Sequence, residues 1–167
     1  MENLDKAINL YGAGLAAAHG PFVDYERAIS FYRKSAELGF AGAQNNLGDM
    51  YEHGCGTAQS DVLAMYWYAR AAERGEPTAY LSLASLLYKH KLDQSMLVEA
   101  MKYAFCAFAL LPDGGNKAMT RALIKLLTTE LSEDEVCKAR ALALDWHPLF
   151  QEQYLLSDDP TFAYKCQ

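Results

Sequence analysis

The sequence lacks any segment that would carry the chain into or across a membrane. Residues 1–5 are acidic, and no basic segment followed by a continuous apolar run is present, so we expect no signal peptide. The longest apolar run, residues 103–111, is about half of the ~20 residues that a membrane helix needs. We therefore expect no membrane partner and a cytoplasmic location.

Cysteine pairs and positive charge are also scarce. The cysteines form no Cys-x-x-Cys pair and do not recur at a fixed spacing, which favours a reducing compartment over a disulfide framework. The net charge is −6, which disfavours the phosphate backbone of a nucleic acid as a ligand and favours a basic protein partner. The cysteines are Cys55, Cys106, Cys137 and Cys166.

Catalytic and metal-binding signatures are missing as well. The chain contains no Ser-x-x-Lys, no Gly-x-Ser-x-Gly and no His-Glu-x-x-His motif. The glycines on either side of Cys55 follow no strand and precede no Gly-Lys-Ser/Thr, so they mark a turn and not a phosphate loop. Only Glu52 and Cys55 could join a histidine as metal ligands. We expect no enzyme, no cofactor and no metal. The histidines are scattered, at His19, His53, His90 and His147.

What the sequence does contain is a helix–turn–helix unit in residues 41–76. Leu47, Gly48 and Tyr51 fall on one face of a 3.6-residue helix, and the small Gly48 would let a second helix approach closely. Gly54 ends this helix, because glycine takes the left-handed conformation without penalty. The pattern predicts one complete two-helix unit.

Weaker copies of this unit occur at a shift of 36 residues on both sides. Gly48 maps to Ala84 in the C-terminal direction, and the Trp67-Tyr68 pair maps to Phe31-Tyr32 in the N-terminal direction. A fixed period of this length predicts a solenoid, in which two-helix units stack to bury their apolar stripes.

The aromatic pairs recur at helical spacing, and we expect them to form the core between the helices. On this interpretation Trp67 is buried together with Tyr68, and Phe31 together with Tyr32. Trp67→Ala should then cost about 3–5 kcal/mol of stability.

The glycine, small and aromatic positions of the central unit form a continuous motif. It reads Leu47-Gly48-x-x-Tyr51-x-x-Gly54-x-Gly56, followed by Ala64-x-x-Trp67-Tyr68-x-x-Ala71-Ala72-x-x-Gly75. This motif resembles the Sel1-like repeat, a relative of the tetratricopeptide repeat. The resemblance is close over residues 41–76, fair over residues 7–40 and partial over residues 77–112.

The chain departs from the family pattern in three places. Thr57 stands where the family favours valine, and Ala13-Gly14 stands in for the Leu-Gly pair in the first unit. The third unit has lost both turn glycines. The repeat character is therefore clearest in the central unit, residues 41–76.

The resemblance implies an all-α fold, an α-α superhelix or solenoid of helix–turn–helix repeats in a single domain, residues 1–167. After three units, Ser132 and Glu135 form a capping box in a hairpin that should close the array. The aromatic tail either docks on the array as a short helix or binds a partner or a second copy. The units are residues 2–40, 41–76 and 77–112, the capping hairpin is 113–146, and the tail is 147–167.

A stripe beside the packing face of the first helix in each unit is the candidate binding site. In a tetratricopeptide-like array these first helices line the concave side, so the stripe would form a groove with an acidic middle and apolar ends. The hypothesis is that the groove binds a peptide or protein loop, and the alternative is a solvated helix face. The groove residues are Tyr11, Leu15, Asn45, Asp49, Glu52, Leu81, Ser85 and Tyr88.

The function expected from these features is non-enzymatic protein binding by an adaptor or regulator. The resemblance implies bacterial signalling, secretion or virulence-related assemblies as typical settings. Two alternatives stay open: an immunity protein that neutralises a bacterial toxin, and a structural homo-oligomer joined through the aromatic tail. A monomer is favoured over an oligomer.

Overall fold

The computed structural model describes residues 2–146, and every regular element in that range is a helix, which confirms the predicted all-α fold. The chain divides into two compact units, residues 1–79 and 80–167, and each is described by itself. The helices are α1 (Glu2–His19), α2 (Tyr25–Glu37), α3 (Ala41–His53), α4 (Asp61–Ala72), α5 (Pro77–His90), α6 (Gln94–Leu110), α7 (Gly115–Glu130) and α8 (Glu133–Trp146).

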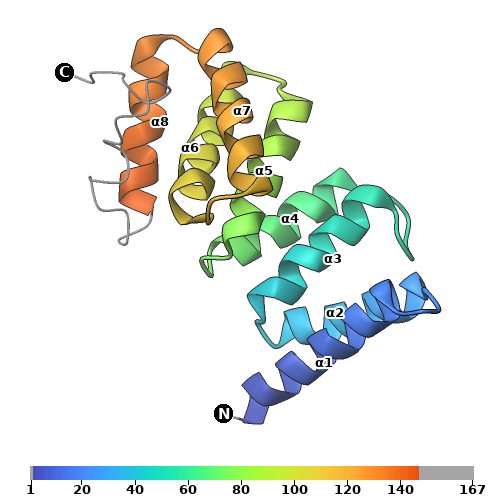
Figure 1. The fold of residues 1–167 in the computed structure, drawn as a ribbon. Helices are drawn as coiled ribbons and strands as arrows, with labels where there is room; N and C mark the ends of the chain where they lie inside the picture. Colours follow the sequence, from blue (N-terminus) through green and yellow to red (C-terminus); the bar gives the residue numbers. More distant parts are fainter. Residues whose placement is uncertain (1, 147–167) are drawn as a thin grey trace. The chain divides into compact units, whose positions relative to one another are not determined.

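The first unit consists of two helical hairpins, α1–α2 and α3–α4, with α2 packed against α3 (Figure 1). Side-chain caps start the second helix of each hairpin. The Asp24 carboxylate accepts a hydrogen bond from the Arg27 backbone N–H at 2.9 Å, and the Ser60 hydroxyl accepts one from that of Leu63 at 3.3 Å. Gly54 ends α3 at φ +70°, the left-handed conformation predicted for it.

Each hairpin of the first unit is closed by a tyrosine ring that lies directly on a glycine. A Cβ atom on Gly48 would stand 2.6 Å from a ring carbon of Tyr68, and one on Gly14 would stand 2.5 Å from a ring carbon of Tyr32. Real Cβ atoms do not approach other atoms so closely. The close approach predicted at Gly48 is therefore present, and Gly14 fills the same role in the first repeat.

The tyrosine of each aromatic pair, and not its neighbour, occupies the core. Tyr32 and Tyr68 are 2% and 1% exposed, whereas Phe31 and Trp67 are only half-buried. The Trp67 ring stands edge-on to that of Tyr66, with 5.1 Å between the ring centroids, and it lies under the Arg70 guanidinium. The expectation that Trp67 belongs to the core is wrong, because the residue that faces the glycine is one position further along the helix. Trp67→Ala should accordingly cost less than Tyr68→Ala.

Buried polar side chains tie the hairpins of the first unit together. The Ser35 hydroxyl donates to the backbone carbonyl of Ala7 at 2.7 Å, which joins α2 to α1. The Gln44 amide donates to the carbonyl of Ala36 at 3.0 Å, which joins α3 to α2. Both side chains are fully buried, so each bond satisfies a group that water cannot reach.

The second unit is built around α6, which contacts α7 and α8. Nearly every side chain of α6 from Leu97 to Phe108 is buried. The capping box predicted before α8 is present: the Glu135 carboxylate accepts from the Ser132 backbone N–H at 2.9 Å, and the Ser132 hydroxyl accepts from that of Glu135 at 3.4 Å.

The glycine–tyrosine pair is absent from residues 77–112. At the 36-residue shift, Gly48 corresponds to Ala84 and Tyr68 to Ala104, and both alanines are fully buried. The segments that carry them, α5 and α6, still form as helices.

Two other expectations concern the cysteines and the tail. Cys55 and Cys106 are free thiols, whereas Cys137 on α8 is disulfide-bonded. Burial raises the pKa of the Cys106 thiol to about 12, so this thiol stays protonated. The expected docking of the tail lies outside the described residues.

Gly48→Ala should destabilise the protein, because the added methyl group must push the buried Tyr68 ring aside. Overpacking of this kind costs about 1–3 kcal/mol, and alanine returns about 1 kcal/mol of helix propensity, so we expect a net loss of up to roughly 2 kcal/mol. Urea unfolding measures this difference.

The matched control is Gly12→Ala in α1, where an added Cβ would meet nothing within 4 Å. This variant should gain roughly 0.5–1 kcal/mol from helix propensity alone. If the two variants are equally stable, the close contact between Gly48 and Tyr68 does not restrict which residue fits at position 48.

Candidate protein-binding surface

The polar stripe predicted on α3 lies beside the core and not in it. Leu47, Gly48 and Tyr51 face the core and are buried. Asn45 is half-buried, and its Oδ1 has no hydrogen-bond partner among the described residues. The Asp49 side chain is 61% exposed. The stripe thus offers polar groups to solvent from a helix whose other face is fixed by packing.

Glu52, the third member of this stripe, is partly used inside the unit. The Tyr68 hydroxyl donates a hydrogen bond to the Glu52 carboxylate at 2.8 Å. This bond satisfies the polar end of a tyrosine whose ring is buried against Gly48. Glu52 therefore has a structural partner, whereas Asp49 points its charge toward solvent.

Asp49 pairs with His53, one helical turn further along α3. The His53 Nδ1 lies 3.2 Å from the Asp49 carboxylate and donates to the Asp49 backbone carbonyl at 3.0 Å. The carbonyl and, to a smaller extent, the carboxylate raise the pKa of His53. Both side chains are exposed, so the pair contributes little to stability and leaves the carboxylate accessible.

Tyr11 on α1 meets the beginning of α3. The centroid of its ring lies 4.9 Å from that of Phe40 and 5.9 Å from that of Tyr32. A Cβ atom on Gly42 would stand 3.5 Å from the Cζ of Tyr11. Tyr11 is half-buried, as is Leu15, one turn further along α1. The structure therefore places these two predicted residues on the helix that neighbours the polar stripe.

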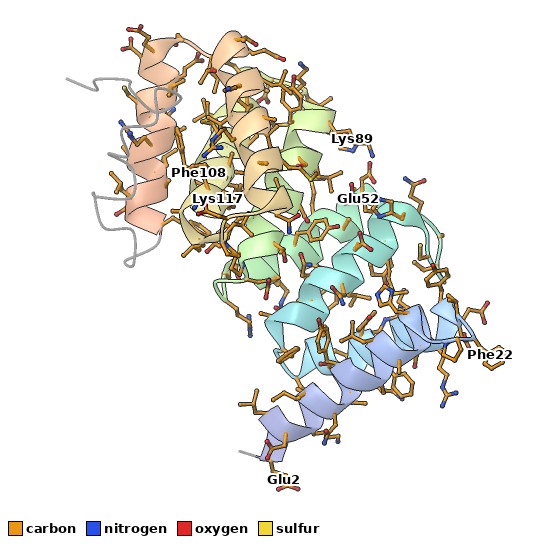
Figure 2. All side chains as sticks on the ribbon, in the orientation of Figure 1. Glu2, Phe22, Glu52, Lys89, Phe108 and Lys117 are labelled. Carbon is orange, nitrogen blue, oxygen red and sulfur yellow. The ribbon has the colours of Figure 1, made fainter. Side chains whose placement is uncertain are left out.

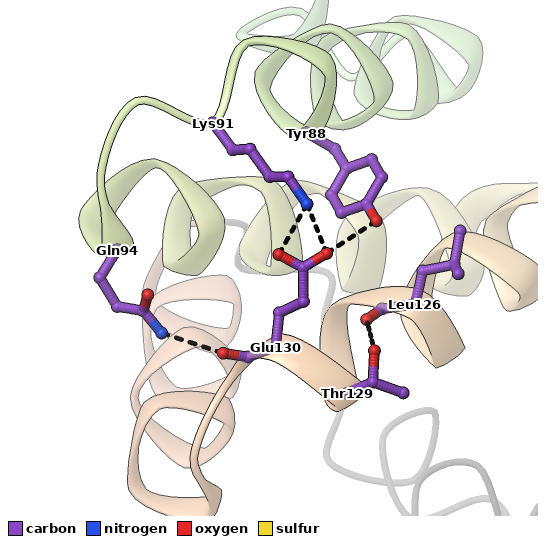
Figure 3. A network of polar contacts seen from close by, with 6 residues as sticks. All are labelled: Tyr88, Lys91, Gln94, Leu126, Thr129 and Glu130. Carbon is purple, nitrogen blue, oxygen red and sulfur yellow. Dashed lines mark hydrogen bonds and ion pairs between the residues drawn. The ribbon is translucent and has the colours of Figure 1, made fainter.

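The remaining predicted residues, on α5, belong to the second unit. Leu81 is 8% exposed, so its side chain is in the core and offers little surface to a partner. Ser85 is exposed. Tyr88 is half-buried and donates to the Glu130 carboxylate at 2.9 Å (Figure 3). Of the three residues, only Ser85 is fully open to solvent.

The Glu130 network was not predicted from the sequence. Lys91 donates to both Glu130 carboxylate oxygens, at 2.5 and 2.7 Å, and the Gln94 amide donates to the Glu130 backbone carbonyl at 3.1 Å (Figure 3). These contacts tie the α5–α6 connection to the end of α7. The Lys91 ammonium, and then the Tyr88 hydroxyl, hold the pKa of Glu130 below its usual value.

A cavity that the sequence analysis missed lies in the first unit, at the end of α1. Its volume is about 160 Å³. It is bounded by α1, α2, α3 and the turn that follows α3, so its walls come from segments far apart in the sequence. The signal for it was present in the repeat comparison, because Ala18 stands where the second repeat has Glu52. The lining includes Ala18, His19, Tyr32, Asn46, Asp49 and Cys55.

A larger, open hollow of about 940 Å³ lies along the turn between α1 and α2. Phe22 and Val23 line it and are 89% and 55% exposed. Figure 2 shows Phe22 at the tip of this turn, pointing away from the helices. The hollow is mainly apolar and lacks a cluster of converging polar groups.

Two negative findings concern the described residues 2–146. No group of three or more histidine, cysteine, aspartate or glutamate side chains there could hold a metal ion. None of the helices there has the length and apolarity required to cross a membrane.

Comparison with known proteins identifies the repeats. Residues 5–40 and 41–76 each match the Sel1 repeat. Over 60 residues the chain is 42% identical to chitin synthase regulatory factor 3 of Schizosaccharomyces pombe, which covers 35% of this chain and 6% of the relative. Over 76 residues it is 32% identical to the exopolysaccharide production negative regulator of Rhizobium meliloti, which covers 38% of this chain and 28% of the relative. The match thus spans a small part of each relative.

Two crystal structures share the fold. A protective antigen of uropathogenic Escherichia coli strains, described as displaying an SLR fold, superposes with a TM-score of 0.74 at 20% identity, over 89% of this chain and 31% of the antigen. A Sel1 repeat protein from Oxalobacter formigenes superposes with a TM-score of 0.57 at 23% identity, over 85% of this chain and 71% of its own.

The fold and these matches define the class of protein as an α-solenoid of helix–turn–helix repeats. Within that class, residues 5–40 and 41–76 are two Sel1 repeats. The resemblance seen in the sequence is confirmed.

Glu130→Gln should reduce stability at neutral pH, and the reduction should disappear in acid. Because the pKa of Glu130 is lower in the folded state, its contribution is fully present above its unfolded-state value near 4.5. The contribution is lost as the pH falls through the lowered folded-state pKa. Unfolding free energies of wild type and variant, measured from pH 7 to pH 3, should therefore converge below pH 4.5.

Lys91→Gln should reproduce most of this effect, because it removes the first cause of the lowered pKa. The double variant should lose less stability than the sum of the two single variants, since both act on one pair. Full additivity would contradict a direct interaction between the two side chains.

Proposed function

We propose that this chain is a non-enzymatic protein-interaction module that acts as an adaptor or regulator. The observation that carries the proposal is the exposed Asp49 carboxylate on α3, which stands between half-buried polar neighbours on a helix whose inner face is locked by packing. A rigid helix that presents accessible polar groups suits recognition of a protein segment more than chemistry, which needs a water-excluding site.

The comparisons support the coarser part of this proposal. Both curated relatives are named as regulators, and each shares with this chain only a segment of the size of one or two repeats. A module that recurs within longer regulatory proteins of different organisms is suited to binding and not to one particular reaction.

The finer part of the proposal assigns the binding surface and the kind of partner. The surface is the groove over α1 and α3 of the first unit, formed by Tyr11, Leu15, Asn45, Asp49 and Glu52. The net charge of −6 and the exposed Asp49 favour a partner with a basic surface. A toxin with a basic element is one such partner, in which case the chain would be an immunity protein.

Asp49→Arg should abolish or strongly weaken capture of the partner. Affinity capture from a lysate of the source organism with the full chain, followed by titration calorimetry with the purified partner, measures this effect. Reversing a charge at the centre of a complementary interface should weaken binding by at least about tenfold. Stability should barely change, since the Asp49–His53 pair is exposed.

Glu73→Arg is the matched control, because Glu73 is an exposed carboxylate at the end of α4, outside the groove. It makes the same change in net charge and should leave binding nearly intact. Glu52 is left unchanged in this test, since its loss would strand the buried Tyr68 hydroxyl. If Asp49→Arg and Glu73→Arg bind equally well, the groove is not the binding surface.

A further inference from the structure

Tyr32 lines the cavity at the end of α1 and carries a buried hydroxyl. The residue is 2% exposed, and its hydroxyl has no hydrogen-bond partner of normal geometry among the described residues. Asn46 lies close enough to affect its pKa, which burial raises and Asn46 partly lowers. A buried hydroxyl without a partner is costly, so a site that retains one requires an explanation.

The second repeat shows how the same tyrosine is satisfied when a carboxylate is available. Tyr68 rests on Gly48 and donates to Glu52, four residues further along the same helix as the glycine. In the first repeat Tyr32 rests on Gly14, and the residue four positions further along is Ala18. Ala18 offers no acceptor to the Tyr32 hydroxyl, which has no partner of normal geometry among the described residues.

Ala18 and Tyr32 both line the cavity of about 160 Å³ at the end of α1. A single water needs roughly 10–15 Å³ of this kind of volume, so the cavity has room for one long side chain. The exposed side chains of His19 and Tyr25 border it, and such side chains change rotamer readily. Nothing larger than a side chain would fit without a change in the backbone.

The polar groups around the cavity favour a cation. The Asp49 carboxylate lies on its lining and acts on the Tyr32 hydroxyl through its charge. The Asn46 side chain lies beside that hydroxyl and lines the same cavity. A guanidinium or ammonium group would donate to the carboxylate and to the hydroxyl oxygen, whereas an anion would be repelled by Asp49.

We propose that this cavity, formed by Ala18, Tyr32, Asn46 and Asp49, receives a single arginine or lysine side chain of the protein partner. The inference rests on the proposed function and names the feature of the partner that the first unit recognises. Tyr32 and Asp49 are the specificity-determining residues: the hydroxyl accepts at the bottom of the cavity and the carboxylate neutralises the charge at its edge.

The test is a titration of the full chain with the tripeptide amide acetyl-Gly-Arg-Gly, followed by two-dimensional NMR at pH 8. We expect binding in the millimolar range, with the largest shifts in the amides of residues 18, 32, 46 and 49. The lysine analogue should bind at the same place, and the glutamate and citrulline analogues should not.

Two variants should weaken this binding. Asp49→Asn should weaken it by about tenfold or more, and Tyr32→Phe by about three- to tenfold, as expected when a hydrogen bond to a charged group is lost. Tyr68→Phe removes the equivalent hydroxyl from the second repeat and should leave tripeptide binding unchanged. The proposal is overturned if neither Asp49→Asn nor Tyr32→Phe alters the affinity. It is also overturned if no binding is seen up to about 50 mM tripeptide, a concentration that would saturate a millimolar site.

Thermal unfolding separates a binding role of the Tyr32 hydroxyl from a structural one. Tyr32→Phe should leave the unfolding midpoint unchanged or raise it, because the hydroxyl makes no bond in the free protein. Tyr68→Phe should lower the midpoint by about 2–4 °C, because it breaks the bond to Glu52. A comparable loss in Tyr32→Phe would mean that the hydroxyl serves the fold, and would overturn the assignment.

The tripeptide titration and the capture from lysate test two different claims, so one claim can be refuted while the other stands. If Asp49→Arg abolishes capture of the partner but the tripeptide does not bind, the proposed function stands and the cavity is not the receptor. If the tripeptide binds as described but no partner is captured, the cavity assignment stands and the proposed function loses its support.

Discussion

The packing of the first unit depends on one repeated contact, in which a buried tyrosine ring lies on a helical glycine. At Gly48 and at Gly14 a single methyl group would stand within 2.7 Å of the ring that faces it. This contact sets how closely the two helices of each hairpin approach, and it fixes the tyrosine and not the preceding aromatic residue as the core side chain. At the equivalent positions 36 residues further along, both residues are buried alanines.

The same contact also links the core to the surface. A ring held against glycine carries its hydroxyl to a defined place at the edge of the hairpin, where it needs a partner. The second repeat supplies Glu52, and this bond occupies one member of the polar stripe on α3. The first repeat has Ala18 in that place, and a cavity remains. The two repeats thus differ at the position that could accept a hydrogen bond from the tyrosine, and the Tyr32 hydroxyl has no partner of normal geometry among the described residues.

Stability and recognition are divided between different residues of one helix. On α3 the inward face packs against α2 and α4, while Asp49 remains exposed and pairs with His53 at little energetic consequence. In the second unit the Glu130 carboxylate is not available to a partner in this way, because Lys91 and Tyr88 both donate hydrogen bonds to it. A residue such as Tyr88, which by spacing alone belongs to the predicted groove, therefore also has a structural role.

The sequence by itself determined the helices, their repeat period, the left-handed turn at Gly54 and the close approach at Gly48, because these follow from local periodicity and from the conformational range of glycine. It also placed Asp49 on an exposed stripe. Only the tertiary structure decided that Tyr68 and not Trp67 is buried, that Leu81 belongs to the core and that Tyr88 bonds to Glu130. It alone decided that Ala18, Tyr32, Asn46 and Asp49 surround one cavity. Each of these depends on which side chains of distant segments meet, and a 36-residue period aligns positions without specifying the rotation at which helices pack.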